Sequence, residues 1–319
     1  MDSSLLGFLE QFSYSLSVVD QTFKSSYGCE RIAAALIHLS KGVQADPTKL
    51  HNCKSLLNES LKFFHPFRGI DLPIITSYMA TANDPNWYLN SALKAYECLK
   101  AHFPMGYLAP SSAIAMETVP TDLIPSKISA LKGVSQYFGS KYPMSQRSDK
   151  LPSFLMITMT EDPNETVKNA DALYELIRPN HRFHAFSYAT VLCLDSKDND
   201  TKARELHQFI NAAKQRGTPF EPTYSYSQYI GFLSLAPIPN KAQFFTDVAE
   251  VSKWMTSNRN YLFRYGLYSG SRNNLAALLL LYYYASQGYS ELIDYAIMCT
   301  YAYVNAASIH AHSQNSSST

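Results

Sequence analysis

The sequence predicts an all-α fold made of helical hairpins that repeat about every 39 residues. Three observations carry this prediction. Helix-capping residues recur at a nearly constant spacing, an amphipathic segment follows each of them, and a shorter apolar segment precedes each of them. Because neighbouring repeats stack to share one continuous core, a single helical-repeat domain can extend over residues 1–310.

The capping residues are Asp or Asn, in three places followed directly by Pro. An Asp or Asn oxygen accepts hydrogen bonds from the first turn of a helix, and Pro fits the first helical position because it needs no N–H there. The spacing between successive positions is 38 or 40 residues. We therefore expect six helix starts, at Asp46, Asp84, Asp122, Asp162, Asp200 and Asn240.

The segments after these residues have the spacing of an amphipathic helix. Leu131, Val134 and Phe138 form one such stripe, and Val248, Val251 and Met255 form another. This spacing predicts one buried face on a helix of four or five turns.

The segments before the caps are short and apolar throughout, as in IAAALIHL from Ile32. Periodicity alone does not separate a short buried helix from a buried strand. Their alanine content and their regular recurrence favour helices. We also expect an opening helix over 2–23, repeats over about 28–262, a closing helical pair over about 271–310 and a disordered tail over 311–319.

The curvature of the array is left open by the pattern. The main expectation is an open α-solenoid or α/α superhelix. The alternative is a closed α/α toroid, because about seven hairpins are available.

Composition excludes several classes of protein. The net charge of +1 lacks the basic excess of a nucleic-acid binder. The five cysteines are isolated, so they form neither a zinc-ligand pattern nor a disulfide framework. The N-terminus has no basic segment of a secretory signal, and the most apolar stretch, 275–285, is too short to span a membrane. We expect a cytoplasmic protein without a cofactor.

One repeat carries a recognisable series of residues: Asp84-Pro85, Tyr96, Leu99-Lys100, Phe103, Tyr107-Leu108 and Ala113. A second repeat matches this series less completely, with Asp162-Pro163, Tyr174, Ile177 and Phe183. Over roughly residues 25–260 the chain resembles a family of uncharacterised bacterial proteins, mainly from Firmicutes, that is catalogued as a domain of unknown function. The resemblance implies an all-helical fold. It implies no established activity, and no functional residue carries over from it.

Candidate binding residues lie where the long helices end. His181 and His184 are three residues apart, a spacing that suits a shared metal ion on one helical turn, but they lack an acidic partner at a familiar spacing and also fit ordinary loop histidines. Arg68, Arg182 and Arg264 stand beside aromatic residues. They can line a site for a carboxylate or another anion, or they can simply cap helix C-termini.

Tyrosines gather in two segments near the C-terminal end of the array, and Tyr224, Tyr226 and Tyr268 are the candidates there. They fit a binding lip on a rigid scaffold or a plain connector.

No catalytic motif is present, and the carboxylate pairs fit solvated helix faces. Two function classes remain. The first is a non-enzymatic protein-binding scaffold that holds a peptide or protein in its concave surface. The second is an α/α-toroid enzyme acting on a carbohydrate or lipid. Self-association through 275–284, giving a homo-oligomer, is a further expectation if that helix is left uncovered.

Overall fold

The computed structural model describes residues 1–103, 108–142, 150–220, 226–257, 265, 267 and 269–317, with side chains up to residue 314. Every regular element in these ranges is a helix, which confirms the all-α prediction. The short apolar segments that sequence periodicity left ambiguous are buried helices. None of the helices in the described ranges is long and apolar enough to cross a membrane.

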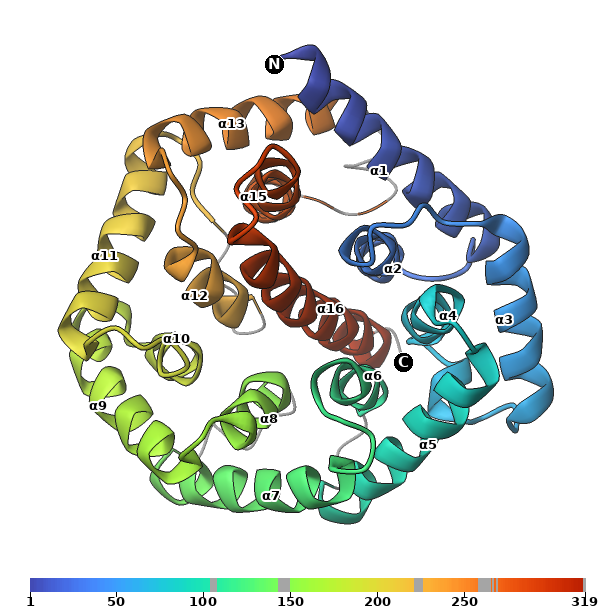
Figure 1. Ribbon diagram of the computed structural model, residues 1–319. Coiled ribbons are helices and arrows are strands. Elements are labelled where there is room, and N and C mark those ends of the chain that lie inside the picture. Colours follow the sequence, from blue (N-terminus) through green and yellow to red (C-terminus); the bar gives the residue numbers. More distant parts are fainter. Residues whose placement is uncertain are drawn as a thin grey trace.

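The helices form two layers around a central one (Figure 1). The outer layer contains α1 (Ser3–Thr22), α3 (Pro47–Ser60), α5 (Pro85–His102), α7 (Ile124–Lys141), α9 (Pro163–His181), α11 (Asn199–Gln215) and α13 (Lys241–Ser257). The inner layer contains α2 (Gly28–Ser40), α4 (Leu72–Thr81), α6 (Ala109–Thr118), α8 (Leu151–Met159), α10 (Ala185–Leu192), α12 (Ser227–Leu235) and α15 (Ser269–Ser286). A short 3₁₀ turn, η1 (Pro66–Arg68), joins α3 to α4.

Most predicted caps begin the outer helices. The carboxylates of Asp46, Asp84 and Asp162 each accept from backbone N–H groups two and three residues further along. Two of the six expected starts are displaced. The α7 helix begins after Leu123 without a side-chain cap, and Asp198 caps α11 in place of Asp200. Asp200 then lies in the first turn of α11, where the helix dipole also favours a negative charge.

The two layers meet through complementary faces. In α7 the buried residues are Ile124, Ile128, Leu131, Val134 and Phe138, which form one stripe. In the inner helices the buried residues are not restricted to one face. The α8 helix, for example, is buried along nearly all of its length. An inner helix is covered by the outer layer on one side and by the interior of the ring on the other, so it needs apolar residues all round.

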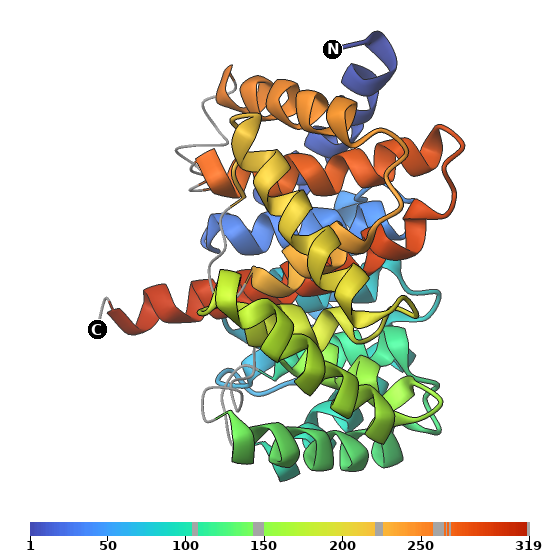
Figure 2. The ribbon, with the colours of Figure 1, turned by 90° about the vertical axis from the view of Figure 1, so that its left-hand side faces the viewer.

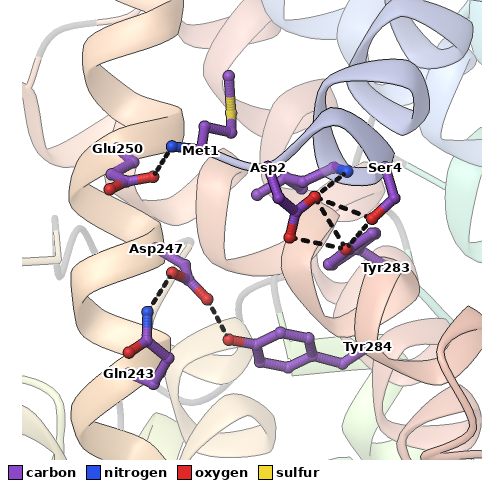
Figure 3. Close-up of polar contacts among 9 residues, drawn as sticks. Met1, Asp2, Ser4, Gln243, Asp247, Glu250, Tyr283 and Tyr284 are labelled. Atoms are coloured by element: carbon purple, nitrogen blue, oxygen red, sulfur yellow. Dashed lines mark hydrogen bonds and ion pairs between the residues drawn. The ribbon is translucent and has the colours of Figure 1, made fainter.

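The first and last outer helices meet, which closes the ring (Figures 1 and 3). The Met1 nitrogen lies 2.7 Å from the Glu250 carboxylate on α13. The hydroxyls of Ser4 on α1 and Tyr283 on α15 lie 2.6 Å apart. The hydroxyl of the neighbouring Tyr284 donates to Asp247 of α13.

The interior of the ring is occupied by α16 (Leu292–Ser317), which runs across it and projects from one face (Figure 2). It packs against α2, α12 and α15 and also contacts α6 and α8. Small residues such as Ala302, Ala306 and Ala307 are buried on it, and they allow the inner helices to approach closely.

The α16 helix extends into the segment 311–319, for which the sequence predicts a disordered tail. The helix continues to Ser317. Its last turns are held because Ser308 donates to the Asp71 carboxylate and the His312 imidazole lies 3.1 Å from the same group. The sequence does not predict these contacts, because Asp71 directly precedes α4 and is far from Ser308 and His312 along the chain.

The observed shape is a closed ring with a helix through its centre. An open, extended array is not confirmed, because the ends of the ring meet. The alternative, a closed α/α toroid, shares the closure of the ring, but in this chain α16 runs through the centre. Residues 275–283 of α15 are buried against neighbouring helices of the same chain, so this segment offers no apolar face to a second copy.

Candidate functional site

The predicted binding residues fall into four groups, of which Arg68 forms one by itself. Tyr224, Arg264 and Tyr268 lie outside the described residues. Tyr226 is buried, and its ring packs against Tyr303 of α16 at 5.3 Å between centroids. His181, Arg182 and His184 come together at one cavity.

Arg68 acts within its own hairpin. Its guanidinium donates to the carbonyls of Asn58 and Leu61, at 3.0 and 2.7 Å, at the end of α3. These contacts match the structural alternative, in which an arginine caps a helix C-terminus. The guanidinium also lies over the ring of the exposed Phe63.

The cavity has a volume of about 220 Å³ and lies where α9 ends, α10 begins and α11 ends. We call it the basic pocket. It is lined by Asn180, His181, Arg182, Phe183, His184, Tyr188, Ile210, Lys214, Phe220 and Ile230.

Local sequence brings these residues together. The α9 helix continues past Pro179, near its end, to His181. His184 then takes the position before α10, and its Nδ1 lies 2.8 Å from the Ser227 hydroxyl of α12. At the end of α11 Gly217 has a φ of 72°, a conformation that glycine adopts without strain. This turn leads the chain back toward the pocket, where Phe220 lines one wall.

The described lining of the basic pocket is cationic on one side and carries no acidic side chain. Arg182 and the exposed Lys214 supply formal charges, and His181 and His184 supply imidazoles. His184 gives α10 no side-chain cap, so the positive end of this helix is also directed at the pocket.

Burial and neighbouring charges keep His181 neutral. Desolvation lowers its pKa to about 4, and the positive charges of His207, Lys214 and His184 act in the same direction. Its Nε2 is buried and has no hydrogen-bond partner within the described residues. An anion in the pocket would reverse the sign of the local field and raise this pKa.

His184 has a lowered pKa for the same reasons. Burial is the larger cause, and the positive charge of Lys150 is the second. The pair His181 and His184 gains no third ligand. Among the described residues, no group of three or more His, Cys, Asp or Glu side chains is arranged to hold a metal ion.

A second set of titratable groups lies inside the ring. Glu30 in the first turn of α2 is fully buried, and burial together with the nearby Asp71 carboxylate raises its pKa to about 10. Neither carboxylate oxygen of Glu30 has a hydrogen-bond partner within the described residues. Asp71, which is 1% exposed, holds Ser308 and His312. These carboxylates are sealed by α16 and line none of the three cavities described here.

A further cavity, of about 450 Å³, opens where α4 and α6 end and α5 begins. It contains two carboxylates, those of Asp84 and Glu117, beside the exposed Trp87. Asp84 caps α5, and Glu117 is paired with Lys41. Both carboxylates are therefore held in structural contacts, and nothing in their arrangement favours acid–base catalysis.

Sequence reasoning missed Lys214 and the Glu30–Asp71 pair. Lys214 reads as an ordinary surface lysine in the last turn of a helix, and only the fold places it beside His181. Glu30 lies in the first turn of α2 and Asp71 directly precedes α4, and no spacing in the sequence connects them.

The comparison with family models matches residues 15–310 to the family described as protein of unknown function DUF4003. The match spans most of the chain, so this protein belongs to that family. This result agrees with the resemblance to an uncharacterised all-helical family that the repeat residues indicated. Neither the comparison with curated proteins nor that with solved structures gave a match.

Proposed function

We propose that this protein is a non-enzymatic binding scaffold that takes an acidic side chain of a peptide or protein partner into the basic pocket. One observation carries the proposal. His181, Arg182, His184 and Lys214 line a single cavity whose described residues include no acid.

The size and surroundings of the pocket suit a single acidic group. A volume of about 220 Å³ is smaller than that of ordinary small-molecule sites, which are roughly 300–1,000 Å³. A carboxylate at the end of a short side chain fits such a space. The exposed ring of Phe183, which lines the pocket, supplies an apolar contact for the rest of a peptide.

The position of the site differs from the concave surface expected from sequence. In this fold α16 fills the concave interior, so a partner would approach the face of the ring where α9 and α11 end. Arg182 and Lys214 lie at this face beside the neutral imidazole of His181. The charged groups supply attraction at a distance, and a bound anion raises the pKa of the imidazole, which donates to the anion once it takes up a proton from solvent.

The test uses fluorescence anisotropy with a labelled hexaglutamate peptide and with hexaglutamine as the uncharged peptide of equal length. We expect binding of the acidic peptide only, weakened by salt because exposed charges are screened. Replacing Lys214 by Gln should weaken binding about tenfold, which corresponds to about 1.4 kcal/mol.

The matched control is Lys132→Gln, which removes the same charge from an exposed position on α7. It should leave the affinity unchanged. Equal losses in the two variants would show only general electrostatic attraction and would contradict the proposal. Binding of inorganic phosphate, without any binding of the acidic peptide, would assign the pocket to a small free anion instead.

A further inference from the structure

The largest cavity described in this molecule lies at the seam where the ring closes. Its volume is about 700 Å³, within the range of small-molecule sites. Its walls come from α1, from the end of α2 and the turn after it, and from the end of α15 and the start of α16. It lies beside the contacts drawn in Figure 3, because Ser4 and Tyr283 belong to both. We call it the seam cavity.

The seam cavity is mainly apolar and carries no charge. Phe8 and Tyr283 form an aromatic wall, with their ring centroids 5.8 Å apart, and Leu39 extends it. None of its described lining residues is Asp, Glu, Lys, Arg or His. A charged ligand would lose its hydration here without gaining a counter-charge, which is costly.

Two solvent-exposed amide side chains line the cavity. The side-chain amides of Gln11 and Gln44 line it, and neither forms a hydrogen bond within the described residues. An amide can donate and accept at once, so this pair suits an oxygen atom of a hydroxyl or carbonyl group. At the rim, Val43 and Ile293 are 47% and 37% exposed and offer an apolar entrance.

A glycine keeps the space open. Gly7 lies inside α1 and lines the cavity, and a Cβ atom built on it meets nothing within 4 Å. Glycine is a poor helix former, so a larger residue at this position would favour the helix and would fill the cavity instead.

We propose that the seam cavity binds an uncharged, mainly apolar small molecule that carries a hydroxyl or carbonyl group. The chemistry is that of the aromatic wall and the two free amides. This site is separate from the basic pocket and does not depend on the function proposed for it. A ligand here would touch α1, α15 and α16 together, so it would also stabilise the closed ring.

The experiment measures the fluorescence of N-phenyl-1-naphthylamine, an uncharged probe that becomes bright in apolar surroundings. The wild-type chain should bind it, and Gly7→Leu should abolish the binding by filling the cavity. Gly7→Ala adds a single methyl group and should retain it. The sulfonated relative, 1-anilinonaphthalene-8-sulfonate, should bind at least about tenfold more weakly, because the cavity has no cation to pair with a sulfonate.

The matched control is Gly133→Leu. Gly133 lies in the outer helix α7, where an added Cβ also meets nothing within 4 Å, but it lines none of the cavities described above. This variant should fold and bind the probe like the wild type. Equal probe binding by Gly7→Leu and Gly133→Leu, or preferred binding of the sulfonate, would overturn the proposal. So would a dimer in sedimentation velocity that Gly7→Leu disrupts, because a second copy would then occupy the seam.

Discussion

Glu30 inside the ring and His181 at its face show how differently burial acts on two titratable groups. Burial raises the pKa of Glu30 to about 10 and lowers that of His181 to about 4, because it disfavours the charged form of each. Glu30 is sealed beneath α16, whereas His181 lines a cavity beside exposed charges. Only His181 can therefore respond to a ligand without unfolding. An altered pKa indicates a binding site when the group is also reachable.

The two groups also act on stability in opposite directions of pH. Glu30 keeps its proton in the folded chain but loses it above its ordinary value of 4.5 when unfolded. Stability therefore falls as pH rises from about 4.5 to about 10. His181 resists protonation in the folded chain, so stability falls as pH drops from 6.5 to about 4.

The largest expected effect concerns the interior. Replacing Asp71 by Ala removes the carboxylate to which the buried Ser308 donates and one hydrogen-bond partner of His312. We expect a loss of about 2–4 kcal/mol in the free energy of unfolding, measured with urea at pH 7. The control is Asp247→Ala at the half-buried seam contact with Tyr284, where we expect about 1 kcal/mol. Equal losses would contradict the view that the interior is the more tightly sealed region.

A smaller effect of opposite sign is expected at Glu30. Glutamine has nearly the same shape as protonated glutamic acid but carries no ionisable proton. Glu30→Gln should therefore stabilise the chain by about 1–3 kcal/mol at pH 8, where the unfolded wild type gains by ionising. At pH 5 the difference should nearly vanish. Urea unfolding at both pH values measures it, and a gain that is the same at pH 5 and pH 8 would exclude a raised pKa as its cause.

Much of the fold follows from the sequence because its signals are local. The capping of α5 by Asp84 depends on residues within one turn, and the stripe of α7 depends on 3.6-residue periodicity. Local signals also mislead where two capping residues compete, as Asp198 and Asp200 do at α11.

The closure of the ring and the position of α16 depend on contacts between residues that are far apart in the sequence. The periodicity of the sequence does not predict such contacts. Ser4 with Tyr283 and Asp71 with Ser308 are examples. A helix that is buried all round has no amphipathic face to show where it packs.

The candidate site was predictable only where its residues are close together in the sequence. His181, Arg182 and His184 are close in sequence, so their grouping could be expected from the sequence alone. Lys214 reaches them only because α9 and α11 are neighbours in the outer layer. The seam cavity had no sequence signal, because its lining comes from both ends of the chain.

The central claim is that the basic pocket takes an acidic group, and the NMR titration of His181 with and without hexaglutamate tests it most directly. We predict a pKa near 4 in the free protein and a rise of at least about one unit with bound peptide, because the carboxylate stabilises the imidazolium. Adding hexaglutamate should not change the resonance of the exposed His51 on α3 at any given pH, so this residue serves as an internal reference. If the peptide binds while the pKa of His181 does not move, the pocket is not its binding site.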